Sequence, residues 1–318
     1  MIVIHLLMLL FSVALIYFSA EFLLESVVQL AKRLNIRPFV IGLTVVSFVS
    51  SLPELGISLF SVYRNQPEIM IGNIIGSNIA NIALIIGTSG IIRPLIVQKT
   101  IGRRDIYIML VATILFSIFI LDRTIERTNG LILFIGIVLF NFFLIRGSNK
   151  KRNNGTTNLQ ETQFLLKNVM NQKRLILTLV LGAAGLIVGA RFVVQAAGDL
   201  ANDFGISSMV VSLSLVAVGT ALPELSMAIV SSLRKQTEFL VGNIIGSNIY
   251  NLFFVIGFTG FVHPANLIGE KLLFQIIALV IFSMMLTYFS RSNFDITRNE
   301  GIFLVVVYFS YIILSYSI

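Results

Sequence analysis

The sequence predicts an all-α integral membrane protein, with ten transmembrane helices arranged as two inverted five-helix repeats and with broken helices at the centre. Hydrophobic residues make up 56% of the 318 residues and charged residues only 12%, which is too apolar for a water-soluble chain of this length. Apolar runs of about 20 residues, the length that crosses a bilayer, recur along the chain. The octapeptide GNIIGSNI occurs at 72–79 and returns at 242–249.

The apolar runs predict helices, because a backbone in hydrocarbon must satisfy its own hydrogen bonds. The first run has no basic residues ahead of it and is long for the core of a signal peptide, so we expect it to be retained. The ten expected spans are residues 2–22, 38–63, 69–92, 105–121, 129–145, 174–194, 207–232, 239–262, 271–290 and 300–317.

The distribution of Lys and Arg predicts the orientation, because these residues are retained on the cytoplasmic side. With the N-terminus outside, 18 of the 23 basic residues fall in cytoplasmic segments. We therefore expect a multi-pass protein of the cell membrane with both termini extracytoplasmic. The net charge of +8 then reflects topology and not nucleic-acid binding, and no obligatory protein partner is evident. The absence of cysteine excludes disulfides and thiolate metal sites.

The internal repeat predicts the domain organisation. A shift of 170 residues, with no gap, aligns LPEL at 52–55 with LPEL at 222–225 as well as the octapeptides. Five spans per half is an odd number, so the second half enters the membrane upside down. Such repeats are typical of secondary transporters with a site near the midplane, although a duplicated bundle without a site is an alternative. We expect a first repeat at 1–146 (repeated block about 38–92), a cytoplasmic linker at 147–172 and a second repeat at 173–318 (block about 207–262).

Glu54 and Glu224 are the two carboxylates expected well inside apolar helices. A carboxylate at that depth costs at least about 2.5 kcal/mol on insertion scales, and no Lys, Arg or His is expected at the same depth. The sequence therefore predicts a metal ion or protons as the partner of this pair. Two permanently protonated glutamates that hydrogen-bond between helices are the alternative.

A proline precedes each glutamate. Pro53 and Pro223 each remove an amide donor from a helix and free carbonyls about one turn earlier, near residues 47–49 and 217–219. Free carbonyl oxygens inside a membrane are potential ligands for a cation.

Hydroxyl groups accompany both glutamates. Ser50 and Ser51 precede Glu54 by four and three residues and so share its helix face, as Thr220 does for Glu224. Carboxylate, hydroxyl and carbonyl oxygens are the ligands that hard cations such as Ca²⁺ prefer. Taken singly, each hydroxyl is equally well explained by a bond to its own helix backbone.

The octapeptide places a polar stripe beside two glycines. Its polar residues recur every fourth position, and its GxxxG spacing lets a neighbouring helix approach closely. We expect these glycines to place the stripe against the LPEL helix of the same half, so that its oxygens face the glutamate. The stripe residues are Asn73, Ser77 and Asn81, then Asn243, Ser247 and Asn251. For Asn73, Asn78, Asn243 and Asn248, interhelical hydrogen bonding and ion ligation are equally good explanations.

The pattern G-T-S-L-P-E followed by G-N-x-x-G-S-N-x-x-[DN], once in each half, resembles the α-repeats of the calcium/cation antiporter superfamily, specifically its prokaryotic sodium/calcium exchanger branch. The resemblance covers nearly the whole chain. It implies a secondary active transporter that exchanges Ca²⁺ for Na⁺ by alternating access, with these ions as substrates and without a cofactor. It also implies that Glu54 and Glu224 bind Ca²⁺ centrally, together with oxygens at Ser50 and Thr220.

The resemblance further implies flanking Na⁺ positions. They would use the Ser47 carbonyl, Ser51 and Ser77 in one half and the Ala217 carbonyl, Thr220 and Ser247 in the other, with Asn81 and Asn251 completing the middle.

Four positions depart from the family pattern. The first copy reads VSSLPE, so Val49 replaces a glycine and Ser50 stands for threonine. In the second copy, Ala221 replaces a serine hydroxyl, which puts the Na⁺ position near it in question. Asn251 stands where many relatives have Asp, and this leaves two deep carboxylates instead of three.

Two glutamates give a simple charge account. Their charge of −2 is neutralised by one Ca²⁺, two Na⁺ or two protons, so competition for the same carboxylates is sufficient for exchange. A Ca²⁺/H⁺ antiporter, or one for another divalent cation and H⁺, is the alternative, and a passive cation channel is a weaker one. No deep pairing of His, Cys or Asp offers a nucleophile with a base, so we do not expect an enzyme.

Overall fold

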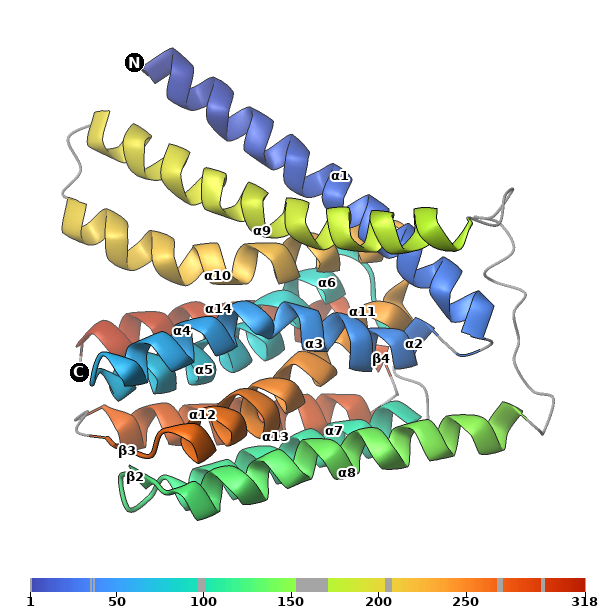
Figure 1. Cartoon of the computed structure of the whole chain (residues 1–318). Helices are drawn as coiled ribbons and strands as arrows, with labels where there is room; N and C mark the ends of the chain where they lie inside the picture. Colours follow the sequence, from blue (N-terminus) through green and yellow to red (C-terminus); the bar gives the residue numbers. More distant parts are fainter. Residues whose placement is uncertain are drawn as a thin grey trace. The chain divides into compact units, whose positions relative to one another are not determined.

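The computed structural model describes residues 2–34, 36, 38–96, 101–152, 171–203, 208–267, 271–292 and 295–317 (Figure 1). The described chain is almost entirely helical, and helix overlaps each of the ten expected spans. Among the described residues, eight helices are long and apolar enough to cross a membrane. The other two expected spans fall on helices α7 (Ile101–Phe119) and α10 (Ser208–Leu233), and the count of ten stays a prediction.

The chain divides into two compact units, one formed by residues 1–37 and 157–234 and the other by the remainder. Unit 1 contains α1 (Ile2–Leu34), α9 (Gln172–Asp203) and α10. Helices α1 and α9 are antiparallel and closely packed, and α10 contacts both. A Cβ added at Gly182 would lie 3.0 Å from the backbone nitrogen of Leu23, which shows how near the two backbones come.

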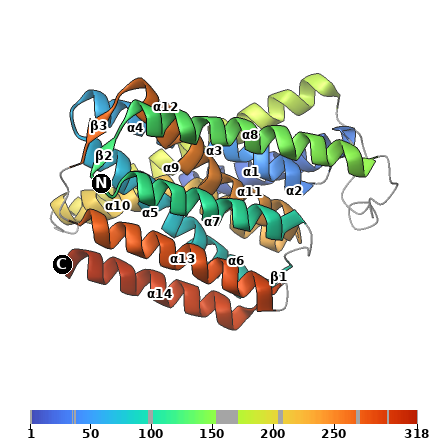
Figure 2. The same ribbon diagram turned by 90° about the horizontal axis from the view of Figure 1, so that it is seen from below.

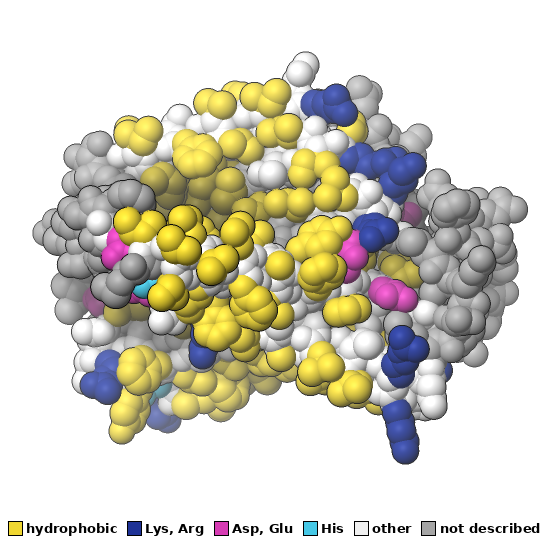
Figure 3. All heavy atoms as spheres, turned by 90° about the horizontal axis from the view of Figure 1, so that it is seen from above, with side chains coloured by type: hydrophobic (Ala, Val, Ile, Leu, Met, Phe, Trp, Pro, Cys, Tyr) yellow, Lys and Arg dark blue, Asp and Glu magenta, His cyan; other side chains and the backbone are white. Residues whose placement is uncertain are grey.

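Unit 1 presents apolar side chains outward. Val3, Leu7 and Phe11 on α1 and Val180 and Leu181 on α9 are all more than half exposed. Figure 3 shows a face of the molecule on which hydrophobic side chains predominate. Exposed apolar helix faces of this extent are those of a protein surrounded by lipid.

Unit 2 contains the remaining segments, and its core is formed by helices from both halves of the sequence. The segments are α2 (Pro38–Ile41), the π-helical turn η1 (Gly42–Val46), α3 (Ser47–Ser50), α4 (Leu52–Tyr63), α5 (Pro67–Ala80), η2 (Asn81–Ile85), α6 (Ile86–Ile92), α7, α8 (Arg127–Arg152), α11 (Thr237–Ile249), η4 (Tyr250–Ile256), α12 (Gly257–Val262), α13 (Leu272–Ser292) and α14 (Arg298–Ser317), with strands β1 (Leu95–Ile96), β2 (Thr124–Ile125), β3 (Ala265–Asn266) and β4 (Asp295–Ile296).

Contacts within unit 2 follow the internal repeat (Figure 2). Gly87 on α6 packs against Gly301 on α14, and Gly257 on α12, the repeat counterpart of Gly87, packs in the same way against Gly130 on α8. The short strands are repeated in the same way: β1 pairs antiparallel with β4, and β2 pairs antiparallel with β3. Each of these contacts joins one half of the sequence to the other.

The turn after each LPEL helix is also repeated. Asn65 and Lys235, which are 170 residues apart, both adopt positive φ, at 58° and 62°. The preceding arginines cap the helices alike, with Arg64 N–H donating to Phe60 O at 3.1 Å and Arg234 N–H donating to Val230 O at 2.9 Å. The same sequence pattern therefore builds the same turn twice.

The two LPEL helices differ. The first is interrupted by η1 and by a turn at Ser51, and Pro53 then lies in the first turn of α4, where its missing N–H costs little. The second runs as one helix, α10, with Pro223 inside it. The helix is therefore broken in the first copy and continuous in the second.

Helix α8 extends into the segment expected as the linker. Residues 147–152 are helical, because α8 continues to Arg152 as a single helix. Residues 153–170 lie outside the described part of the chain.

Candidate functional site

Glu54 lies in the first turn of α4 and is 4% exposed. Ser51, Ser58 and Ser61 share its buried face, whereas Phe60 on the opposite side is 62% exposed. Helix α4 thus turns a polar face inward and an apolar face outward, which is the arrangement of a membrane helix that lines a polar site. The hydroxyl oxygens of Ser51 and Ser58 have no hydrogen-bond partner among the described residues.

Glu224 lies on α10, in unit 1, and is 8% exposed. Its Oε2 atom is buried and has no hydrogen-bond partner among the described residues. Thr220 and Ala217 precede it on the same helix, and their side chains lie outside the described part of the structure. Glu54 belongs to unit 2, so the meeting of the two glutamates stays a prediction.

Helix α11, which carries the second octapeptide, packs against the first LPEL segment, residues 38–63. A Cβ at Gly242 would contact Phe39 O, and one at Gly246 would lie 2.6 Å from Leu43 O. The expectation that these glycines pack against the LPEL helix of their own half is therefore wrong for the second copy. They pack against the opposite half, because the helices cross within unit 2.

Two candidate ligands from opposite halves meet at this crossing. The hydroxyls of Ser50 and Ser247 are 3.0 Å apart. Nearby, the Ser47 hydroxyl donates to the backbone oxygen of Asn243 at 2.9 Å. The structure thus brings into contact Ser50, which the resemblance implies as a Ca²⁺ ligand, and Ser247, which it implies as a Na⁺ ligand.

The Ser47 carbonyl is not left free by Pro53. It accepts hydrogen bonds from the Ser51 backbone N–H at 3.1 Å and from the Ser50 hydroxyl at 3.2 Å. A cation that binds this oxygen would therefore have to displace the Ser50 hydroxyl, because a carbonyl has two lone pairs.

Two buried asparagines make contacts that also cross between halves. Asn81 Nδ2 donates to Asn248 Oδ1 at 3.1 Å, and Asn251 Nδ2 donates to Ser77 Oγ at 3.2 Å. Ser77 and Asn251 were both predicted as ligands, and they lie in contact. The remaining Oδ1 of Asn251 is buried without a hydrogen-bond partner among the described residues.

Cation ligands here would be mostly neutral oxygens. Among the described residues, no group of three or more His, Cys, Asp and Glu side chains is placed to hold a metal. Isolated carboxylates combined with hydroxyl, amide and carbonyl oxygens form a ligand set suited to hard cations.

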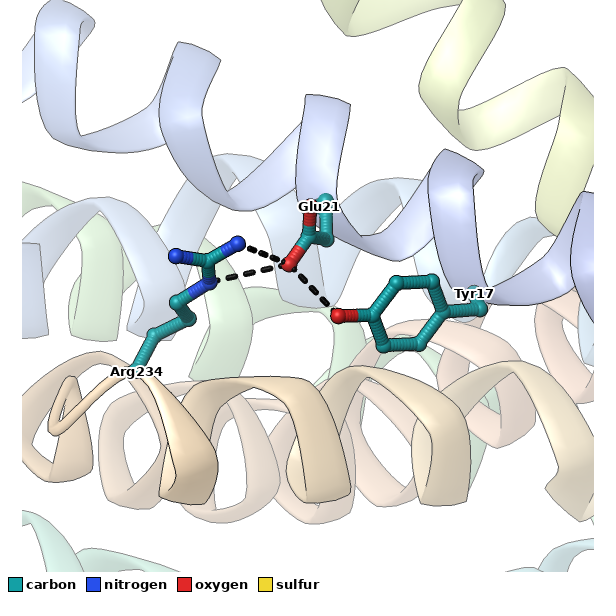
Figure 4. Close-up of polar contacts among 3 residues, drawn as sticks. All are labelled: Tyr17, Glu21 and Arg234. Carbon is teal, nitrogen blue, oxygen red and sulfur yellow. Dashed lines mark hydrogen bonds and ion pairs between the residues drawn. The ribbon is translucent and has the colours of Figure 1, made fainter.

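A further carboxylate inside an apolar helix, Glu21, was not predicted to pair with a cation. Glu21 was expected at the end of the first span, but α1 continues to Leu34 and places it inside. Its Oε1 accepts from the Arg234 guanidinium, with 2.9 Å from Nε, and from Tyr17 OH at 2.9 Å (Figure 4). The hydrogen bonds that Arg234 donates to Glu21 raise the pKa of Arg234, so this guanidinium stays charged. The sequence pattern that could have indicated a hydrogen-bonded carboxylate here is the tyrosine four residues before the glutamate.

Two further carboxylates are paired. Asp105, at the start of α7, is fully buried and forms an ion pair with Arg104 at 2.8 Å. His5 Nδ1 lies 2.7 Å from Asp203 Oδ2, and this contact joins the ends of α1 and α9.

Comparison with known proteins gives consistent matches. Residues 4–146 and 174–317 match the family described as sodium/calcium exchanger protein. The sodium/calcium exchanger MaX1 of Methanosarcina acetivorans is 34% identical over 352 residues, with both chains fully covered. The inner membrane protein YrbG of Escherichia coli is 31% identical over 262 residues, covering 82% of this chain and 80% of that protein.

Solved structures of the sodium–calcium exchanger NCX_Mj are similar throughout. One, soaked without Na⁺ and Ca²⁺, has a TM-score of 0.83 at 29% identity and covers 98% of this chain and 99% of its own. Another, soaked with 2.5 mM Na⁺ and 10 mM Sr²⁺, has a TM-score of 0.81 at 31% identity over the same shares.

Proposed function

Because the chain belongs to the sodium/calcium exchanger protein family, within the calcium/cation antiporter superfamily, we propose that it exchanges Ca²⁺ for Na⁺ by alternating access, with Glu54 and Glu224 as shared ligands. The family and the similarity in fold identify a membrane cation exchanger with an all-α fold. The ions and the ligands are the proposal.

The observation that carries the proposal is the meeting of candidate oxygen ligands from both halves. Ser50 lies against Ser247 and Ser77 lies against Asn251, with Glu54 buried on the adjacent helix α4. Hydroxyl and amide oxygens beside a carboxylate suit Na⁺ and Ca²⁺, whereas a proton exchanger needs only the carboxylates. This favours Na⁺ over H⁺ as the counter-ion.

Charge balance explains how exchange is coupled. A bare carboxylate pair is costly to carry through hydrocarbon, so the protein changes its access state when one Ca²⁺ or two Na⁺ neutralise the glutamates. An ion that binds the same carboxylates excludes the other. The cations are thus carried alternately, and neither leaks past the other.

The test is Ca²⁺ uptake by purified protein in proteoliposomes. Vesicles loaded with Na⁺ should accumulate ⁴⁵Ca²⁺, and vesicles loaded with K⁺ at the same pH should not. Glu54→Gln and Glu224→Gln should each abolish uptake. The matched control is Glu68→Gln with Glu238→Gln, the repeat-related carboxylates in the first turns of α5 and α11, which should retain it. Uptake driven by a pH gradient and indifferent to Na⁺ would replace this proposal with Ca²⁺/H⁺ exchange.

A further inference from the structure

Asn248 lies in the last turn of α11 and is 1% exposed. Its Oδ1 accepts a hydrogen bond from Asn81 Nδ2, and its own Nδ2 donates to the Met109 sulfur on α7 at 3.5 Å. Three buried side chains from three helical segments therefore form one directed chain of hydrogen bonds. Asn81 is 4% exposed and Met109 is fully buried.

The direction of this chain is set at the sulfur. A thioether can only accept a hydrogen bond, so the amino end of the Asn248 amide must face Met109 and its oxygen must face Asn81. Because the Asn248 oxygen can only accept a hydrogen bond, Asn81 must direct its amino group toward Asn248. Reversing either amide would place two acceptors against each other without a proton between them.

A cation uses only one end of an amide. Oδ1 binds a metal ion and the amino group does not, so the rotamer of an asparagine ligand decides whether it can coordinate. With its amino end held by Asn248, Asn81 has its oxygen directed away from that helix. Fixing the ligand in advance removes the cost of orienting it at the moment of binding.

We propose that Asn248 is a positioning residue for the cation site, which fixes the amide of Asn81 with its oxygen available to the ion. This rests on the proposed function, in which Asn81 is a ligand. Asn248 itself does not touch the cation, and Met109 sets the direction of its amide.

The repeat provides an internal comparison. The counterpart of Asn248 is Asn78, which is fully buried, and neither of its amide atoms has a hydrogen-bond partner among the described residues. The counterpart of Met109 is Leu279, which has no acceptor to orient an amide. Asn251, the counterpart of Asn81, is held by Ser77 instead. The directed chain is thus built once, from residues that differ between the halves.

The experiment compares Ca²⁺ binding to purified variants by calorimetry and their uptake kinetics in proteoliposomes. Asn248→Leu should weaken apparent Ca²⁺ affinity by about 3- to 10-fold, the loss expected for one hydrogen bond, with maximal rate retained. Thr113→Val, which removes a buried hydrogen bond to Ser283 one turn after Met109 on α7, is the control and should leave affinity unchanged. Met109→Leu is the milder second variant, should Asn248→Leu fail to fold, and should weaken affinity in the same direction.

A double variant separates positioning from general stability. Asn81→Asp offers an oxygen at both ends, so its orientation no longer matters. Adding Asn248→Leu to Asn81→Asp should therefore change affinity by less than about 2-fold. An equal loss with and without Asn81→Asp, or an equal loss for Thr113→Val, would overturn the positioning role. Failure of the proposed function looks different, since the unmodified protein would then show no Na⁺-driven Ca²⁺ uptake.

Discussion

Thr113 and Ser283 hydrogen-bond to each other, with their hydroxyl oxygens 3.2 Å apart, and they are 170 residues apart in the sequence. The two positions are therefore counterparts in the internal repeat. A residue that contacts its own counterpart must lie beside the axis that relates the two halves. Helices α7 and α13 thus pack together on the pseudo-twofold axis of unit 2.

This contact predicts a disulfide. Thr113→Cys with Ser283→Cys should form an intramolecular bridge on mild oxidation, because two side-chain atoms already in contact are within disulfide reach. The natural chain has no cysteine, so no other bridge competes. The bridge is read from intact mass and from thiol labelling after denaturation. The single variants are the controls, and two persistently labelled thiols in the double variant would argue against the axis.

The two glycine pairs of the octapeptide should respond differently to substitution. A Cβ at Gly246 meets the backbone oxygen of Leu43, whereas one at Gly76 meets no described atom within 4 Å. Gly246→Ala should therefore lower stability by about 1–3 kcal/mol, since backbone cannot yield as a flexible side chain does. Gly76→Ala is the matched control. Thermal unfolding in detergent measures both, and equal midpoints would refute the crossing of α11 with the first LPEL segment.

Arg234 should matter more than Glu21 to the stability of unit 1. Arg234→Gln leaves the Glu21 carboxylate inside an apolar helix without its cation, which is the costlier half of a broken pair. Glu21→Gln leaves an arginine that is half exposed and can reach water. We expect the double variant to unfold at a higher temperature than Arg234→Gln alone.

Arg64→Gln is the control for this pair. Arg64 is the repeat counterpart of Arg234, but its guanidinium lies over the Phe60 ring, and the position equivalent to Glu21 is Arg191. The Arg64→Gln variant should therefore unfold at a temperature close to that of the unmodified protein. An Arg64→Gln midpoint as low as that of Arg234→Gln would show that the carboxylate is not the cause.

Asn251→Asp should change the ion dependence of transport. An aspartate cannot donate to Ser77, so the serine hydroxyl must turn from Ile74 O toward the new carboxylate. The site then carries three carboxylates, and we expect tighter cation binding with a changed Na⁺ dependence of Ca²⁺ uptake. Asn141→Asp on α8, at the amide that accepts from Tyr250 OH, is the control for added charge. Identical Na⁺ and Ca²⁺ dependences in Asn251→Asp and the unmodified protein would exclude Asn251 from the site.

Much of the fold was predictable because membrane helices and repeats leave strong local signals. Long apolar runs located the helices, and the repeated polar letters identified residues that join the two halves, such as Ser77 and Asn251. Hydrogen-bonding requirements in lipid leave few other structures for such a sequence.

Other features depend on contacts that a sequence does not encode locally. Identical octapeptides could not reveal which half Gly246 packs against, because that choice depends on how the helices cross. The Glu21 ion pair was missed because hydropathy falls before α1 ends, while packing against α9 keeps the chain helical to Leu34. The β1–β4 and β2–β3 pairs join two-residue strands that lie far apart in the sequence, and no local pattern marks them.

We propose that Glu54 and Glu224 share one cation, and equilibrium ⁴⁵Ca²⁺ binding to the purified protein measures whether they do. We expect one Ca²⁺ per chain, displaced by Na⁺, and loss of that ion in both Glu54→Gln and Glu224→Gln. If either variant still bound Ca²⁺ with unchanged affinity and stoichiometry, the two carboxylates would not form a single site.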